Sequence, residues 1–345
     1  MSQLNRDAWF SLDGESAVVA GDNLAATAAL PSGAFTIVYL DPPFNTGRVQ
    51  RRERFVGSRL PDDAAEPAPE GASRSGDAGA APAPAGRGTQ PSPTPSGAEA
   101  HQSRVGEGVR SGFRGASYAS VRTELARYND RFEDFWGFLF PRLEEAWRLL
   151  AEDGTLYLHL DYREAHYAKV AMDALVGRER FVNEIIWAYD YGARPKRRWP
   201  AKHDTILMYV KDPMRYHFDS SEVQREPYMA PGLVTKEKAV RGKLPTDVWW
   251  HTIVSPTGKE KTGYPTQKPL GILKRIIAAS SREGDWVLDL FAGSGTTGAA
   301  AAELGRRFVC VDAHADAVDV MRRRLPAARF IDLRWDERAG DGEPR

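Results

Sequence analysis

The sequence predicts an α/β fold, in which a mainly parallel sheet carries helices on both faces. Short apolar runs of strand length alternate with amphipathic stretches of helical length along most of the chain. Several of these runs contain no polar position, as expected for strands that are buried on both faces. Three of the runs end in unusual residues, at the sheet edge where such folds bind their ligands.

The first ordered block begins as a strand, a helix and a second strand. Ala17–Ala20 and Phe35–Leu40 are apolar runs, and a helical stretch, Asn23–Leu30, lies between them. Farther along the chain, an amphipathic pattern predicts a helix from about Phe132 to Ala151. The run TLYLHL at 155–160 then predicts a buried strand.

The C-terminal part repeats this alternation. The pattern predicts a helix over Pro269–Ser281 and a strand over Trp286–Leu290, followed by a Gly-rich turn. A helix over Thr296–Leu304 comes next, and the strand Phe308–Val311 is closed by Asp312.

One long segment between the blocks has a different composition. From Pro61 to Ala100, 31 of 40 residues are Ala, Pro, Gly, Ser or Thr, and none is a large apolar residue. Such a segment cannot bury enough apolar area to offset the entropy of ordering it. We therefore expect residues 57–117 to form a disordered insertion, either a tolerated linker or a flexible lid.

Composition excludes several classes of protein. The single cysteine, Cys310, permits no internal disulfide or cysteine-based zinc cluster, and the seven histidines show no ligand spacing, so no metal site is expected. No run is long and apolar enough to span a bilayer, and the start of the chain lacks the features of a secretory signal. We expect a cytoplasmic protein without a membrane partner.

The formal net charge of zero hides an uneven distribution. Between Trp187 and Thr262 there are 14 Lys or Arg against 9 Asp or Glu, a net charge of +5. Within this segment, Arg194-Pro-Lys-Arg-Arg198 is interleaved with aromatic residues. Such a mixture suits phosphate contacts combined with base stacking, although a charge run is more often only a solvated face.

The Gly-rich turn after Trp286–Leu290 is the first candidate site. Gly293, Gly295 and Gly298 satisfy G-x-G-x-x-G, in which glycine permits a tight turn and close approach of a ligand to the backbone. Asp312 follows the next strand, where a carboxylate can bind ribose hydroxyls. A dehydrogenase remains an alternative on this evidence alone.

The second candidate site is Asp41-Pro-Pro-Phe44, directly after the strand Phe35–Leu40. Two consecutive prolines cannot continue a central strand, because they supply no N–H and fix φ. They hold the Asp41 carboxylate, the Pro42 carbonyl and the Phe44 ring rigidly at the edge of the sheet.

These residues resemble a known family, the S-adenosylmethionine-dependent DNA amino-methyltransferases, in the group whose catalytic motif precedes the cofactor motif (beta-type order). DPPF at 41–44 resembles the catalytic motif and FAGSG at 291–295 the cofactor motif. The similarity continues through GDN at 21–23, GTLYLHLD at 154–161, NEIIW at 183–187 and TQKPLGILKRII at 266–277.

The resemblance implies a circularly permuted, Rossmann-like class I methyltransferase sheet of seven strands, mixed in direction, with a small embedded target-recognition region. It implies S-adenosylmethionine as the cofactor, with Asp312 on the ribose, the loop after Leu290 around the methionine portion, Asp22 near the adenine, and Thr266 to Lys268 completing the pocket. The full set of expected cofactor-binding residues is Asp22, Asn23, Asp41, Thr266, Gln267, Lys268, Asp289, Phe291, Ala292, Gly293, Ser294, Gly295, Thr296 and Asp312.

The chemistry implied for DPPF needs no nucleophilic protein residue. If Asp41 and the Pro42 carbonyl accept both hydrogens of a nucleobase amine, the nitrogen lone pair is aimed at the sulfonium methyl. A base in duplex DNA must be rotated out of the helix, and Phe44 would stack on it. The expected catalytic residues are Asp41, Pro42, Pro43 and Phe44. Methylation of a ring carbon would need a cysteine, and Cys310 is expected to be buried within a strand.

The resemblance favours N6 of adenine because the first motif residue is Asp41, and N4 of cytosine is the alternative. An RNA or protein-amide methyltransferase and a non-catalytic DNA-binding subunit stay open. The expected partner is double-stranded DNA, which implies association with the nucleoid; a cognate restriction endonuclease and a homodimer are further options. The expected DNA-binding residues are Trp187, Tyr189, Arg194, Lys196, Arg197, Arg198, Lys202, Lys236, Lys238, Arg241 and Lys243.

These expectations divide the chain into six parts: the catalytic-motif part at 1–56, the insertion at 57–117, the continued methyltransferase domain at 118–187, the recognition region at 188–263, the cofactor-binding part at 264–335 and a tail at 336–345.

Overall fold

The computed structural model describes residues 10–44, 48–59, 107–111, 117–130, 134–192, 194–255 and 257–333. The chain forms two compact units, one made of residues 1–50 and 128–345 and the other of residues 51–127. The motifs DPPF, FAGSG and TQKP all belong to the first unit.

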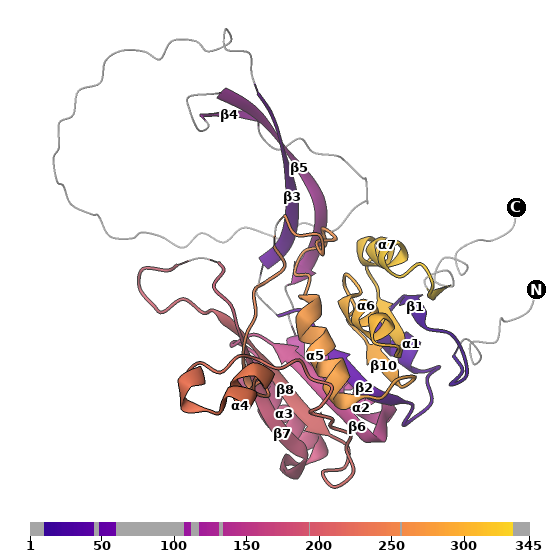
Figure 1. Ribbon diagram of the computed structural model, residues 1–345. Coiled ribbons are helices and arrows are strands. Elements are labelled where there is room, and N and C mark those ends of the chain that lie inside the picture. Colours follow the sequence, from indigo (N-terminus) through magenta and orange to yellow (C-terminus); the bar gives the residue numbers. More distant parts are fainter. Residues whose placement is uncertain are drawn as a thin grey trace, which may run out of the picture. The chain divides into compact units, whose positions relative to one another are not determined.

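A sheet of nine strands forms the centre of the first unit (Figure 1). Its order is β12-β1-β11-β10-β2-β6-β8-β7-β9. The strands are β1 (Ala17–Ala20), β2 (Phe35–Leu40), β6 (Leu150–Leu160), β7 (Phe181–Ala188), β8 (His203–Val210), β9 (Val248–Trp250), β10 (Trp286–Asp289), β11 (Arg307–Asp312) and β12 (Arg329–Asp332).

The α/β class and the permuted order are confirmed, and the strand number is corrected from seven to nine. The strand β10 lies between β11 and β2, although its sequence comes late in the chain. Strands β12 through β6 run parallel, whereas β8 is antiparallel to both β6 and β7. The short strands β9 and β12 form the two edges of the sheet, with three and four residues. The number seven was implied by the family resemblance, and runs this short show no readable period-2 pattern that would have corrected it.

Helices cover both faces of the sheet (Figure 1). On one face pack α5 (Leu270–Ser280), α6 (Thr296–Glu303) and α7 (Ala315–Arg324), and on the other α1 (Asn23–Thr27), α2 (Phe135–Leu149) and α3 (Ala165–Val176). Along β2, Ile37 and Tyr39 belong to the first core, whereas Val38 and Leu40 belong to the second. Successive strand residues point to opposite faces, so a fully apolar strand fills two cores at once.

The helix bounds follow from local capping. The Asp22 side chain accepts hydrogen bonds from the backbone N–H groups of Leu24 and Ala25 and so starts α1. Asp134 caps α2 through the N–H of Gly137. The helix predicted to end near Ala151 ends at Leu149, because Leu150 is already extended and begins β6.

The second unit contains a sheet of three strands in the order β3-β5-β4. Its strands are β3 (Arg48–Arg59), β4 (Glu107–Ser111) and β5 (Ser117–Asp130), and β4 pairs antiparallel with β5 from Glu107 opposite Val121 to Ser111 opposite Ser117. These strands include residues 57–59 and 107–111, which corrects the expectation of disorder at both margins of the insertion. Residues 60–106, 112–116 and the tail at 336–345 lie outside the described residues.

The expected recognition region at 188–263 contributes strands to the sheet. It includes β8, which lies inside the sheet between β6 and β7, and the edge strand β9. The rest of the region comprises loops, a short helix α4 (Lys236–Arg241) and a 3₁₀ turn at Pro231–Leu233. No helix in the described ranges is long and apolar enough to cross a membrane.

Candidate active site

A cavity of about 310 Å³ opens at the carboxyl edge of the sheet. Strands β2 and β10 are parallel neighbours, with Tyr39 level with Asp289, so their ends deliver two distant motifs to one place. The residues of the expected site that line this cavity are Asp22, Asn23, Asp41, Pro42, Pro43, Phe44, Thr266, Gln267, Lys268, Asp289, Phe291, Ala292, Gly293, Ser294, Thr296 and Asp312. Gly295 is absent from the lining and begins α6 as its N-cap.

The DPPF segment forms one end of the cavity. The Asp41 carboxylate accepts a hydrogen bond from Lys268 Nζ, with 2.7 Å between Nζ and Oδ1. Both side chains are largely buried, with 17% and 10% of their surfaces exposed. The Lys268 ammonium also lies 4.6 Å from the centre of the Phe44 ring. The lysine therefore holds the carboxylate of a cavity-lining residue through Oδ1.

The loop after β10 is organised by Asp289. This carboxylate accepts hydrogen bonds from the Phe291 N–H at 2.9 Å and from the Thr297 hydroxyl at 2.5 Å. Burial raises the pKa of Asp289 to about 7; the two hydrogen bonds oppose that rise, and the nearby Asp41 carboxylate adds to it. The loop is thus held by a carboxyl group whose charge is costly in the folded protein.

Asp312, at the end of β11, holds the other side of the same loop. Its carboxylate accepts hydrogen bonds from the N–H groups of Gly293 and His314, both at 2.8 Å. Burial raises the pKa of this carboxyl group as well. Strand-end carboxylates fixed by backbone N–H groups are suited to hydroxyl groups or a cationic group of a ligand.

Two glycines of the G-x-G-x-x-G pattern are required by geometry. Gly295 has a φ of +71°, and a Cβ there would lie 2.7 Å from Met321 Cγ. Gly298 lies in α6, and a Cβ there would lie 2.9 Å from Cys310 Sγ. The third glycine of the pattern therefore allows α6 to pack closely on β11. Cys310 is fully buried, as predicted.

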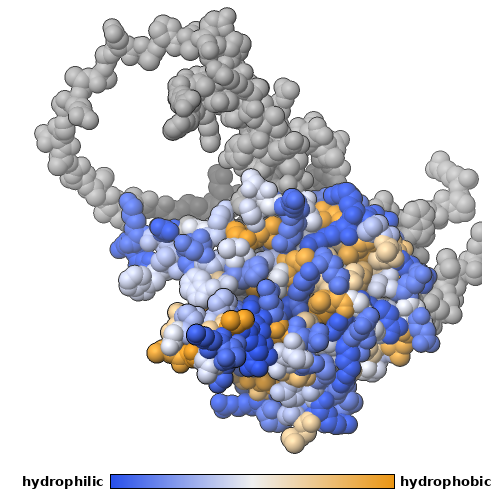
Figure 2. Space-filling view, in the orientation of Figure 1, coloured by the Kyte–Doolittle hydropathy of each residue, from blue (hydrophilic) through white to orange (hydrophobic). Residues whose placement is uncertain are grey.

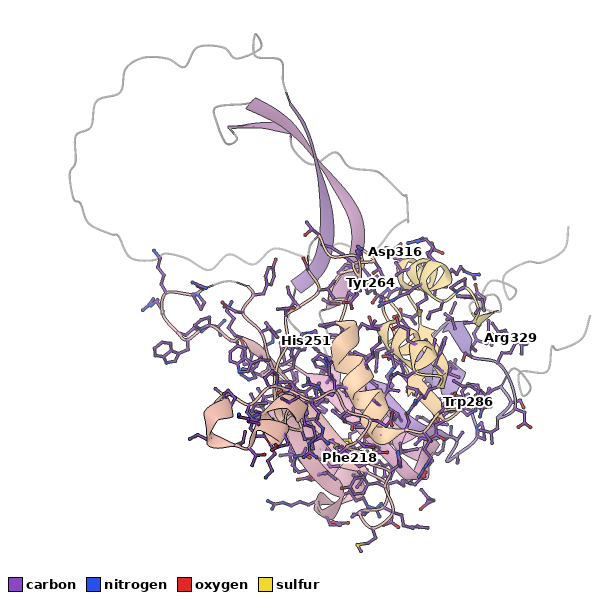
Figure 3. All side chains as sticks on the ribbon, in the orientation of Figure 1. Phe218, His251, Tyr264, Trp286, Asp316 and Arg329 are labelled. Carbon is purple, nitrogen blue, oxygen red and sulfur yellow. The ribbon has the colours of Figure 1, made fainter. Side chains whose placement is uncertain are left out.

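The TQK segment, residues 266–268, precedes α5 in the chain and lines the cavity. The Gln267 side chain accepts from the Thr262 N–H and donates to the Glu260 carbonyl, both at 2.8 Å. Thr266 has a positive φ of 58°, a conformation that is uncommon for a non-glycine residue. Tyr264, labelled in Figure 3, comes within 3.1 Å of a Cβ placed on Gly293. This segment thus packs directly against the glycine loop.

Sequence reasoning missed Arg142, which holds the other end of the cavity. Its guanidinium donates to the Asn23 side-chain oxygen and, at 2.8 Å, to Asp22 Oδ2. It also lies 3.9 Å from the centre of the Phe138 ring, which lines the cavity beside Phe291. The only available signal was a charged residue on the apolar face of a predicted helix.

A buried polar chain behind Phe44 was also missed. The Tyr39 hydroxyl lies 2.7 Å from His159 Nδ1, and His159 Nε2 donates to Asp204 at 3.2 Å. Burial raises the pKa of Tyr39 well above its usual value, and the Asp41 carboxylate raises it further. Burial is the largest influence on the pKa of Asp204 and acts to raise it, but the hydrogen bonds from His159 and Tyr189 and the nearby Lys268 cation together outweigh burial and lower that pKa. The His159 ring lies 6.0 Å from the Phe44 ring, so this chain supports the wall of the cavity.

The expected DNA-binding residues do not form one group. Trp187 is corrected to a core residue, since only 3% of its surface is exposed and its indole N–H donates to the His251 carbonyl (His251 is labelled in Figure 3). Tyr189 is half-buried and donates to Asp204. The loop residues Arg194, Lys196, Arg197 and Arg198 are exposed, as are Lys236, Lys238 and Arg241 around α4, whereas Lys202 and Lys243 are half-buried.

The fold and the site define a class: an α/β protein with a glycine loop and two strand-end carboxylates facing a rigid DPPF segment in one cavity. The model of the N6/N4 methyltransferase family, described as "DNA methylase", matches residues 35–323. The chain belongs to this family. The resemblance to the S-adenosylmethionine-dependent DNA amino-methyltransferases is thereby confirmed.

Individual relatives agree with this assignment. The Type II methyltransferase M.HpaI of Haemophilus parainfluenzae is 32% identical over 197 residues, which cover 57% of this chain and 61% of that protein. The DNA adenine methyltransferase YhdJ of Escherichia coli (strain K12) is 33% identical over 202 residues, covering 56% and 68%. The chain thus spans about two thirds or less of the length of these two relatives. The solved PvuII DNA methyltransferase (cytosine-N4-specific) has a TM-score of 0.52 at 12% identity, covering 92% of this chain and 95% of its own, and shares the fold.

Proposed function

We propose that the protein is a DNA methyltransferase that transfers a methyl group from S-adenosylmethionine to the exocyclic amine, N6, of an adenine rotated out of duplex DNA. The observation that carries this proposal is the shared cavity, in which DPPF and the glycine loop meet although they are far apart in sequence. A transfer reaction needs donor and acceptor groups side by side, and a single cavity supplies that arrangement.

The residues present fit the cofactor. The volume of about 310 Å³ falls in the range of small-molecule sites. Asp312 would hold ribose hydroxyls, the Phe291–Gly295 loop would surround the methionine portion, and Asp22 with Asn23 would lie at the adenine end. When bound, the cofactor supplies an electrophilic methyl group on a sulfonium sulfur.

The contribution of the chain is to position the acceptor. Asp41 Oδ2 and the Pro42 carbonyl would accept the two amine hydrogens, which aims the nitrogen lone pair into the cavity. The Phe44 ring, backed by His159, offers a face on which a rotated base can stack. Asp41 and the adenine methyltransferase among the relatives support adenine as the target.

Double-stranded DNA is the proposed partner, bound by the exposed basic residues of the loop after β7 and of α4. Phosphate contacts are the default role for such residues, and they would not by themselves give sequence specificity. A cognate restriction endonuclease, a homodimer and association with the nucleoid are compatible with this proposal, and the functional role of the 57–117 segment is open within it.

The test is transfer of labelled methyl from S-adenosylmethionine to duplex DNA, with RNA and protein as competing acceptors. We expect transfer to DNA, with N6-methyladenine identified by mass spectrometry of the nucleosides and loss of transfer in Asp41→Ala. Asp153→Ala is the matched control, because that carboxylate pairs with Arg282 away from the cavity. N4-methylcytosine in the product would move the proposal to cytosine, and full transfer by Asp41→Ala would refute the assigned mechanism. Calorimetry that detects no cofactor binding would instead favour a non-catalytic subunit.

A further inference from the structure

Trp199 is almost completely exposed. In the loop between β7 and β8, 94% of its surface is accessible to solvent, more than for any other tryptophan in the described ranges. An indole usually buries most of its large apolar surface, so a protruding tryptophan rimmed by polar residues marks a surface that meets a partner.

The chemistry around Trp199 specifies the partner. The segment Arg194–Lys202, hereafter the basic loop, carries five Lys or Arg and no Asp or Glu. Figure 2 shows hydrophilic residues predominating on the projection after β7, at the left of the view. Basic side chains around an exposed aromatic ring match a polyanion with stacked bases, that is, nucleic acid.

Hydrogen bonds hold the chain before the basic loop against Lys202 at its end. The Tyr189 N–H donates to the Lys202 carbonyl at 2.9 Å, and Lys202 Nζ donates to the carbonyls of Tyr191 and Gly192 at 2.6 and 3.0 Å. Arg198 donates to the Tyr162 hydroxyl at 3.2 Å. Pro200 restricts the backbone of Trp199 to extended conformations. The backbone that carries Trp199 is therefore restrained on both sides of this residue.

Aromatic rings connect the start of the basic loop to the wall of the cavity. The Phe44 ring lies 6.0 Å from that of His159, the His159 ring 5.6 Å from that of Trp187, and the Trp187 ring 5.1 Å from that of Tyr189. Tyr189 also donates to Asp204, which is bonded to His159. A row of packed rings thus connects the face that would receive the base to the start of the basic loop.

We propose that Trp199 inserts into the DNA helix at the position that the target base vacates, while the basic residues of the loop contact the flanking phosphates. Rotating a base out of the stack breaks its pairing and leaves a gap, and an inserted apolar side chain replaces the lost stacking. This inference rests on the proposed function, because it requires a target base that leaves the duplex.

The test compares two duplexes that carry the target sequence, which is first identified by sequencing the modified DNA of cells that express the protein. In one duplex the target base is paired normally, and in the other it lies opposite a mismatch that already weakens its pairing. For Trp199→Ala we expect kcat/KM to fall about 10- to 100-fold on the paired duplex, the factor for one base–aromatic stack, and much less on the mismatched duplex. Trp199→Phe should keep most of the activity.

Two controls separate insertion from general binding. Arg197→Ala should lose activity equally on both duplexes, because a phosphate contact does not depend on pairing. Tyr167→Ala should change neither rate, since Tyr167 is a 68% exposed aromatic residue on α3 outside the basic loop.

Equal losses on the two duplexes for Trp199→Ala, or no loss, would overturn the proposal. The proposal would also be overturned if Trp199→Ala changed the molecular mass measured by sedimentation but not the discrimination between the two duplexes. Trp199 would then serve an interface between protein chains. Absence of methyl transfer by the unmodified protein on both duplexes would refute the proposed function itself, which is a separate outcome.

Discussion

Replacing Arg142 by methionine tests whether this residue supports the end of the cavity that is proposed to bind the cofactor. The side chain of Arg142 is 9% exposed and bridges two adjacent residues, Asp22 and Asn23, that line the cavity. Methionine keeps most of the aliphatic volume and removes every donor. The substitution therefore separates the hydrogen bonds from the packing of α2.

The magnitude follows from what each partner loses. Asn23 is 8% exposed, so its unsatisfied side-chain oxygen costs about 1–3 kcal/mol of the free energy of unfolding. The Asp22 side chain is 53% exposed, and its ion pair with Arg142 contributes only about 0–1 kcal/mol. We expect a total loss of roughly 1–4 kcal/mol, which lowers Tm by roughly 2–4 °C per kcal/mol.

We also expect a specific effect on cofactor binding, in addition to the loss of stability. Without Arg142, the Asn23 side chain keeps its bond to the Leu290 carbonyl at 3.0 Å but loses the partner that orients its oxygen. We expect the Kd for S-adenosylmethionine, measured by calorimetry well below Tm, to rise at least about tenfold, or about 1.4 kcal/mol.

Arg148→Met is the matched control on the same helix. Arg148 donates to the carbonyls of Thr27 and Leu30 and pairs with Glu145, none of which lines the cavity. Its loss should lower Tm comparably and leave the Kd within about twofold. If both variants lose stability and neither changes the Kd, Arg142 is a structural residue only and the reasoning fails.

Two further predictions concern the glycine loop. Gly295→Ala should lower the free energy of unfolding more than Gly284→Ala, because both positions have a positive φ but only Gly295 would bring a Cβ within 2.7 Å of Met321 Cγ. Positive φ alone costs about 1 kcal/mol, so equal losses of Tm in the two variants would contradict the clash. Burial raises the pKa of Asp289 to about 7. The protonated carboxyl therefore contributes stability that is fully present below about pH 4, the ordinary pKa of an aspartate, and is lost as the pH rises through 7. Asp289→Asn should therefore become more stable relative to the unmodified protein between pH 5 and pH 8 in urea unfolding, and a constant difference would refute the raised pKa.

The sequence predicted the parts of the site that lie at strand ends. DPPF and FAGSG break the apolar pattern abruptly, and Asp312 follows a run with no polar position, so each could be placed at the carboxyl edge of the sheet. Topology then required them to meet, because β2 and β10 are parallel neighbours. Motif residues in this position need no knowledge of side-chain packing to be found.

The supporting residues were missed because their role depends on tertiary contacts. Arg142, His159 and Asp204 lie within a helix or strand, and each has a partner 45 to 120 residues away along the chain. The reverse error occurred at Trp187, whose aromatic ring suggested DNA contact. It lies on a strand covered by core residues, and neither composition nor charge reveals which strand aromatics are covered.

The electrostatics of the cavity explain why such a costly group of carboxylates can serve a cationic ligand. Arg142 and Lys268 each neutralise one lining carboxylate, whereas the two at the glycine loop, Asp289 and Asp312, are held by backbone N–H groups and a hydroxyl. Burial raises the pKa of both, so their negative charges are costly in the folded protein. A ligand that places cationic groups beside them lowers that cost, which supports the proposed binding of a cationic methyl donor in this cavity.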